Sequence, residues 1–262
     1  MRQIKQYQVD AFTDKIFKGN PAAVCPLETW LSDEMMQNIA MENNLAETAF
    51  YVKEGNGFHI RWFTPTVEVD LCGHATLATA FILFHHENLE GDTVTFNSRS
   101  GFLTVTKSGE LLTLNFPVDI FQEVDAVKQL EQSIGFKPQK TFKGKTDYML
   151  VFENENIIRE MKPDFKLMAQ VKARGVIVTA KGTSVDFVSR FFGPQSGGDE
   201  DPVTGSAHTT LTPYWASVLG KKELRAEQLS SRGGKLFCEL HDDRVLISGT
   251  AKLFSEGTIY VH

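Results

Sequence analysis

Polar and apolar positions alternate along much of the first half of the chain. Residues 3–12 and 58–63 follow the period of two that is typical of a half-buried strand. Residues 94–117 contain three further short β runs, which are separated at Gly101 and at Ser108-Gly109. The pattern therefore predicts a first half that is rich in sheet.

Two helices are expected among these strands. Ser32 is followed by two acids, an arrangement typical of a helix N-cap, and it predicts an amphipathic helix that ends near Asn43. The segment 74–86 is different, because its run ATLATAFILF is apolar on every side. A helix of that kind must be enclosed by other elements. We therefore expect a central, buried helix.

The chain also repeats itself. RWFTP at 61–65 reappears 129 positions later as RFFGP at 190–194, and half the chain length is 131. Two more matches follow in the same order: DLCGHAT at 70–76 parallels DPVTGSA at 201–207, and NSRSG at 97–101 parallels SSRGG at 230–234. The repeat predicts two copies of one α+β unit with a boundary near 116–125. A cleft between such halves would bring the two Gly-containing turns together.

Composition and charge narrow the class of protein. The 262 residues are 42% hydrophobic and 23% charged, as in an ordinary globular protein, and the net charge of -6 argues against a nucleic-acid partner. The longest nearly apolar stretch is half of the ~20 residues that span a bilayer, and no apolar signal sequence opens the chain. Three widely spaced cysteines without a CxxC pair fit a reducing compartment. We expect a cytoplasmic protein with no membrane partner.

The two Gly turns are candidate binding sites for a small anion. Gly73-His74-Ala75 and Gly205-Ser206-Ala207 each stand where a helix is expected to begin, so their N–H groups and the helix dipole would favour negative charge. The alternative is that the glycines only allow tight turns and close packing. His74 is either a functional residue or a capping or core histidine.

Glu47 is a carboxylate inside LAETAFYV, a run that otherwise resembles a core strand. Burial would raise the pKa of a carboxyl there toward the range that suits general acid/base catalysis, whereas an edge-strand glutamate would point at water. The residues alone leave both interpretations open.

Other polar residues admit several roles. The acids Asp199, Glu200 and Asp201 could form a cation site, cap a helix or supply an acid/base partner. Cys72 could be a thiolate whose pKa is lowered by a helix start, or a small buried thiol. The histidines form no HExxH motif, so a metal site is not expected.

Several segments together resemble the phenazine-biosynthesis (PhzF-like) isomerase family. They are QVDAFTDKIFKGNPAAVC, NLAETAFYV, RWFTPTVEVDLCGHATLATA, RFFGPQSGGDEDPVTGSAH and LSSRGGKL. The resemblance implies an α+β fold like that of diaminopimelate epimerase, with two pseudo-symmetric domains, each a mostly antiparallel sheet or barrel around a central helix. The expected domains are 1–116, to which 250–262 return, and 125–249.

The resemblance also implies an activity, namely cofactor-independent proton transfer on a small cyclic or amino-acid-like carboxylic acid. It implies catalytic roles for Glu47, His74 and Asp201, and a homodimer. Substrate binding is expected from a second set of residues: Asn20, Gly73, Ala75, Thr204, Gly205 and Ser206.

Two alternatives stay open. One is an epimerase or dehydratase that uses Cys72 with Thr204. A racemase with two thiols is disfavoured, because 201–206 supply no second thiol. The other alternative is a non-catalytic protein that only binds an anion, against which the acid at position 47 argues.

Overall fold

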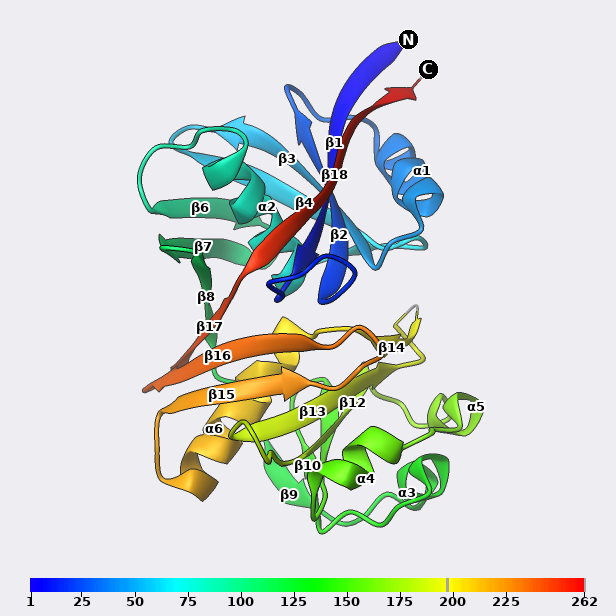
Figure 1. Cartoon of the computed structure of the whole chain (residues 1–262). Coiled ribbons are helices and arrows are strands. Elements are labelled where there is room, and N and C mark those ends of the chain that lie inside the picture. Colours follow the sequence, from blue (N-terminus) through cyan, green and yellow to red (C-terminus); the bar gives the residue numbers. More distant parts are fainter. Residues whose placement is uncertain (197, 262) are drawn as a thin grey trace. The chain divides into compact units, whose positions relative to one another are not determined.

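The computed structural model describes residues 1–196 and 198–261 (Figure 1). The chain divides into two compact units. Unit 1 contains Met1–Asn115 and the residues from Ser248 onward, and unit 2 contains Phe116–Ile247. Among the described residues, no helix is both long and apolar enough to cross a membrane.

Unit 1 is a sheet with two helices among its described residues. Its elements are β1 (Arg2–Ala11), β2 (Asn20–Leu27), α1 (Asp33–Asn43), β3 (Glu47–Glu54), β4 (Gly57–Phe63), β5 (Glu68–Val69), α2 (Gly73–His85), β6 (Thr93–Ser98), β7 (Gly101–Ser108), β8 (Leu111–Pro117) and β18 (Ala251–Val261). The predicted β runs of the first half are confirmed, and β8 continues into the start of unit 2.

Unit 2 is also built from strands and helices. Its elements are β9 (Gln122–Val124), α3 (Lys128–Ile134), β10 (Lys140–Lys143), β11 (Asp147–Val151), α4 (Glu155–Glu160), α5 (Phe165–Met168), β12 (Gly175–Lys181), β13 (Phe187–Gly193), β14 (Gly198–Asp201), the 3-10 turn η1 (Gly205–Ala207), α6 (His208–Leu219), β15 (Glu223–Gln228), β16 (Gly234–His241) and β17 (Arg244–Gly249).

Both predicted helices of unit 1 are confirmed. Ser32 caps α1, and its hydroxyl accepts a hydrogen bond of 3.2 Å from the Met35 N–H. Every residue of α2 except Phe81 and His85 is buried, as the uniformly apolar sequence requires. The buried Thr79 hydroxyl donates to the helix's own backbone, to the Ala75 carbonyl 2.8 Å away, so enclosure leaves that hydroxyl satisfied.

The last strand of the chain, β18, begins at Ala251 and belongs to unit 1. It pairs antiparallel with β1 from Arg2↔Val261 to Ala11↔Ala251 (Figure 1, red beside blue). Unit 1 is therefore built from both ends of the chain.

The two units repeat the same strand pairings. In unit 1, β2/β3 is parallel, β3/β4 and β4/β5 are antiparallel, β4/β6 is parallel and β6/β7 is antiparallel. In unit 2, β11/β12, β12/β13, β13/β14, β13/β15 and β15/β16 follow the same series of parallel and antiparallel pairs. The internal repeat read from the sequence is therefore a structural repeat.

A repeated ion pair fixes the register between the copies. Arg61 donates through Nε and Nη2 to the carboxylate of Glu68, at 2.7 and 2.8 Å. Arg190 makes the same two-pronged contact with Glu200, at 2.7 and 2.9 Å. Glu68 and Glu200 are thus equivalent positions of the two units. The residues that follow them, Val69 and Asp201, are equivalent as well. Asp201 therefore corresponds to Val69 and not to Asp70, because the β13/β14 hairpin is longer than the β4/β5 hairpin.

The helix of unit 2 starts and continues differently from α2. The predicted helix start at Gly205 is a 3-10 turn, and α6 proper begins at His208. Pro213 lies inside α6 and has no N–H to donate to the Thr209 carbonyl one turn earlier. That carbonyl accepts instead from the backbone N–H of Asp119, at 3.2 Å. The helix tolerates its proline because another segment supplies the missing donor.

Candidate active site

Glu47 is the first residue of β3. The residues that follow it in the strand, Thr48 to Val52, are buried, whereas the Glu47 side chain is 18% exposed. The parallel pairing of β3 with β2 places Glu47 opposite Ala22 at the edge of the core. The structure lies between the two sequence interpretations: the carboxylate is neither enclosed like a core side chain nor free in water.

His74 faces Glu47 from the first turn of α2. Its Nε2 lies 3.1 Å from Glu47 Oε2, and its side chain is only 5% exposed. On the other side of the ring, the side-chain amide of Asn20 lies 3.1 Å from Nδ1. Asn20 is fully buried at the start of β2. Three segments that are distant in sequence therefore meet at this imidazole.

Cys72 is the N-cap residue of α2 and also lies against the His74 imidazole. Its Sγ lies 3.5 Å from His74 Nδ1, and ligand atoms of Cys72, His74 and Glu47 all lie within 4.8 Å of one another. The predicted binding residues Gly73 and Ala75 are buried in the same first turn, whose backbone N–H groups form the positive end of the helix dipole.

The protonation of Cys72 differs from the sequence expectation. Burial raises the pKa of the thiol, and the nearby Glu47 carboxylate raises it further. His74 and the Ala75 N–H lower the pKa of Cys72, but by less than burial raises it. The expectation of a lowered pKa at a helix start is wrong here.

His74 shifts in the opposite direction from an ordinary buried histidine. Burial by itself lowers the pKa of the imidazole, but Cys72 and Glu47 raise it more, and the net pKa lies well above the usual value. The positive form of His74 is therefore favoured opposite the Glu47 carboxylate.

The residues predicted in unit 2 form a second cluster. The Thr204 hydroxyl donates to the Asp201 carboxylate, and the Thr204 backbone N–H donates to Gln228 Oε1 at 2.9 Å. Gln228 Nε2 donates to the Asp201 carbonyl at 2.8 Å. Gln228 is buried at the end of β15 and was missed by the sequence analysis, since nothing in a lone polar strand end indicates its partners.

Ser206 has a partner that the sequence did not indicate. Its Oγ accepts a hydrogen bond of 2.9 Å from Arg174 Nη1. The same guanidinium donates to both carboxylate oxygens of Asp147. Gly205 is buried beside Ser206 in η1.

The three acids at 199–201 do not act as one cluster. Glu200 is held by Arg190, Asp201 accepts from Thr204, and Asp199 is exposed. Their separate surroundings argue against the cation site that the sequence left open.

Glu47, Cys72 and His74 are residue types that also bind transition metals. A metal ion at this position would require the Cys72 thiolate, which burial disfavours, and would face the positive end of α2. The donor set therefore fits a cation poorly.

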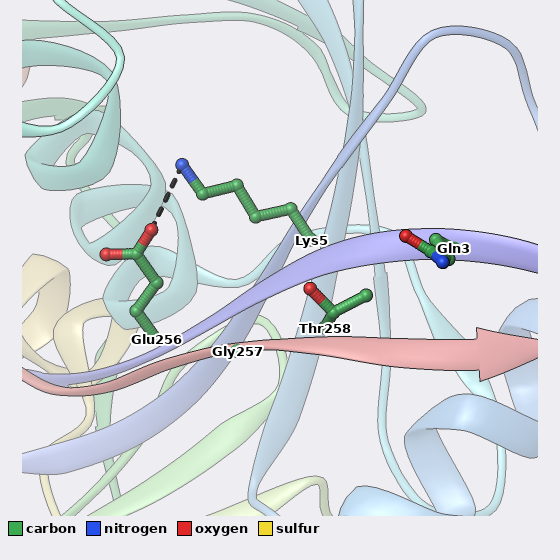
Figure 2. Close-up of a pocket in the computed structure, with 5 residues that line it drawn as sticks. All are labelled: Gln3, Lys5, Glu256, Gly257 and Thr258. Carbon is green, nitrogen blue, oxygen red and sulfur yellow. Dashed lines mark ion pairs between the residues drawn. The ribbon is translucent and has the colours of Figure 1, made fainter.

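A hollow of about 340 Å³ lies elsewhere on unit 1, along β1 and β18. Lys5 and Glu256 point toward each other there, 3.1 Å apart (Figure 2), and Lys5 also contacts Glu87 at 3.3 Å. None of the predicted site residues lines this hollow. Its lysine is already matched by two carboxylates, so it offers a ligand little charge.

Known proteins are similar to this chain over nearly its whole length. A family model described as phenazine biosynthesis-like protein matches residues 9–257. An uncharacterized isomerase of Pseudomonas aeruginosa is 52% identical over 98% of both chains. The crystal structure of a PhzF-family phenazine biosynthesis protein from Enterococcus faecalis is 49% identical, with a TM-score of 0.97 over 99% of this chain and 100% of that one.

A more distant likeness bears on the fold alone. A hydroxyproline epimerase from Agrobacterium vitis superposes with a TM-score of 0.66 at 8% identity, over 98% of this chain and 92% of that one. The predicted α+β fold of the diaminopimelate epimerase type is confirmed.

Proposed function

The chain belongs to the phenazine biosynthesis-like protein family and is an isomerase, and we propose that it moves a proton on a small carboxylic acid through Glu47. The substrate is a cyclic or amino-acid-like acid, and no metal or organic cofactor takes part. Exchange activity should therefore survive dialysis against a chelator.

The observation that carries this proposal is the contact of 3.1 Å between Glu47 and His74 at the first turn of α2. The Glu47 carboxylate takes a proton from a carbon next to the substrate's carboxylate. Negative charge that develops there is stabilised by the His74 imidazolium and by the N–H groups of Gly73 and Ala75. Glu47 then returns the proton to another carbon, so one residue serves both steps.

Residues of unit 2 complete the proposal. Asp201 is proposed as a second catalytic group, and Thr204, Gly205 and Ser206 as substrate-binding residues. The hydrogen bond from Thr204 to Asp201 supports this assignment, because it orients the carboxylate. From the family resemblance, we also propose that the protein is a homodimer, and light scattering tests this. We propose a cytoplasmic location as well.

The alternatives are less well supported. An epimerase or dehydratase based on Cys72 needs a thiolate, and the pKa of Cys72 is raised. Thr204, its suggested partner, already donates its hydroxyl proton to Asp201. A protein that only binds anions has no use for a carboxylate beside His74.

The decisive experiment measures deuterium incorporation. Small cyclic and amino-acid-like carboxylic acids are incubated with the protein in deuterated water, and exchange at carbon is followed by NMR. Glu47→Gln should lower exchange by about 100-fold or more, the usual contribution of a general acid/base group. Glu54→Gln, at the other end of β3, is the matched control and should exchange like the wild type. An active Glu47→Gln protein would refute the mechanism.

A further inference from the structure

The internal repeat identifies the position in unit 2 that corresponds to Glu47. Thr48 pairs with Phe63, and Val176 pairs with Phe192, at equivalent registers of β3/β4 and β12/β13. The residue before Val176, Gly175, is therefore the counterpart of Glu47. A Cβ atom on Gly175 would lie 2.1 Å from the Phe191 ring, so any side chain there would require the ring to move.

Arg174, the residue before Gly175, makes a contact in unit 2 that resembles the Glu47–His74 contact of unit 1. In unit 1, the second residue of the Gly turn, His74, meets Glu47. In unit 2, the second residue of the equivalent turn, Ser206, meets Arg174. The repeat thus preserves a contact between the turn and the start of a strand, but an acid has been exchanged for a guanidinium.

Arg174 is held in one orientation from several sides. Its Nε donates to Asp147 Oδ1 at 2.9 Å, and its Nη2 donates to Oδ2 of the same carboxylate. The guanidinium carbon lies 5.3 Å from the centre of the Phe191 ring. The Asp147 side chain is 4% exposed, so this anchor is itself buried. The direction of the remaining nitrogen, Nη1, follows from these contacts.

We propose that Arg174 is a positioning residue that makes the Ser206 hydroxyl a hydrogen-bond donor to the substrate's carboxylate. A guanidinium can only donate, so Ser206 Oγ must accept from Nη1. The serine's own proton then points away from Arg174 and is available to an anionic oxygen. The inference rests on the proposed role of Ser206 in substrate binding.

Arg174 acts on Ser206 through the direction of their hydrogen bond, and its positive charge is not the cause of the proposed effect. Besides Asp147, the carboxylates of Asp201 and Asp119 interact electrostatically with Arg174. The positive charge is therefore balanced within unit 2. Arg174→Lys keeps that charge but loses the two-pronged contact that aims Nη1.

The test is a double-mutant cycle on carboxylate binding. Acetate, benzoate and cyclohexanecarboxylate are titrated into the wild type, Arg174→Lys, Ser206→Ala and the double variant by calorimetry. We expect binding to the wild type and a threefold to tenfold weaker affinity in each single variant, the usual size of one hydrogen bond. The double variant should be no weaker than Ser206→Ala, because Arg174 acts through the serine.

Arg190→Lys is the matched control, since it breaks an equivalent arginine–carboxylate contact of unit 2 away from Ser206. It should bind like the wild type. If Arg174→Lys does not fold, a variant that combines Arg174→Gln with Asp147→Asn takes its place in the cycle. This variant removes both charges of the ion pair together. The inference is overturned if Arg174→Lys lowers the affinity equally with and without Ser206, or if it does not lower the affinity at all. It is also overturned if none of the three acids binds to the wild type. Binding is measured without turnover, so an active Glu47→Gln protein refutes only the proton transfer.

Discussion

The chemistry of Cys72 is decided by its surroundings more than by its position at a helix start. A helix N-terminus lowers the pKa of a thiol, but burial and the Glu47 carboxylate raise the pKa of Cys72 by more. The pKa of the neighbouring His74 imidazole is also raised, because Cys72 and the Glu47 carboxylate favour a positive charge there by more than burial disfavours it. The two pKa values are linked, because Cys72 and His74 each act on the other's charge.

A substitution at Cys72 should therefore have only a modest effect. Because burial raises the pKa of the thiol and so disfavours the thiolate, we expect Cys72→Ser to lower deuterium exchange less than about tenfold, whereas Glu47→Gln should lower it by about 100-fold or more. Initial exchange rates of both variants against the wild type measure the difference. An inactive Cys72→Ser protein beside an active Glu47→Gln protein would support the epimerase or dehydratase instead.

His208 should make the protein sensitive to acid. It is fully buried, and burial lowers its pKa to about 4, although the bond from Nδ1 to the Thr204 carbonyl opposes the shift. Between pH 6.5 and pH 4 the unfolded chain binds a proton that the folded chain does not. Stability therefore falls as the pH falls through this window, by up to about 3 kcal/mol.

The variant His208→Gln tests this pH dependence by urea unfolding at several pH values. Gln cannot titrate but can still donate to the Thr204 carbonyl, so the loss of stability between pH 6.5 and pH 4 should shrink. His241→Gln, which replaces a half-exposed histidine, is the control. An unchanged pH profile in His208→Gln would show that other groups cause the acid sensitivity.

Among the elements, the β4/β5 and β13/β14 hairpins depend on the same device. Each carries an arginine that grips a carboxylate with two hydrogen bonds, next to a phenylalanine of the same strand, Phe63 or Phe192. The device joins the hairpin's two strands through side chains as well as through the backbone. It also explains why the repeat is visible as RWF and RFF in the sequence.

Glu200 should therefore matter to stability, and its neighbour should not. Glu200→Gln leaves the largely buried Arg190 without its charge partner and should lower the free energy of unfolding by about 2 kcal/mol. Asp199→Asn changes an exposed residue and should have an effect within about 0.5 kcal/mol. Urea denaturation of the two variants provides the comparison, and equal losses would contradict this assignment.

For the whole molecule, the pairing of β1 with β18 makes the first unit depend on the end of the chain. The apolar side chains of Ile4, Tyr7 and Val9 are buried on β1, so loss of its partner strand would expose the core of unit 1. We therefore expect the stability of unit 1 to depend on β18.

Removal of the residues after Thr250 tests this dependence. The backbone amides of β1 should then lose protection against hydrogen exchange, whereas the strands β12 and β13 of unit 2 should keep theirs. Mass spectrometry of peptides from both units measures the two effects in one experiment. Undiminished protection in β1 would contradict the prediction, and deletion of the last two residues alone is the control.

Local patterns were sufficient to predict strands and helices of the first half and the internal repeat, and they singled out two residues that meet in the candidate site. Ser32 as an N-cap, α2 as an enclosed helix and the β runs after it depend on neighbours within a few positions, which the sequence displays directly. Glu47 and His74 could be singled out because each was chemically unusual in its own segment.

Contacts between distant segments were decided only by the tertiary structure. Arg174 reaches Ser206, and Gln228 reaches Thr204, because strand pairing and the turn before α6 bring them together across 32 and 24 positions of chain. No local pattern encodes such a meeting. The raised pKa of Cys72 has the same origin, since burial and a carboxylate on another strand cause it. The sequence by itself determined the strands and helices of the first half and the repeat, and packing decided which side chains meet and how their pKa values shift.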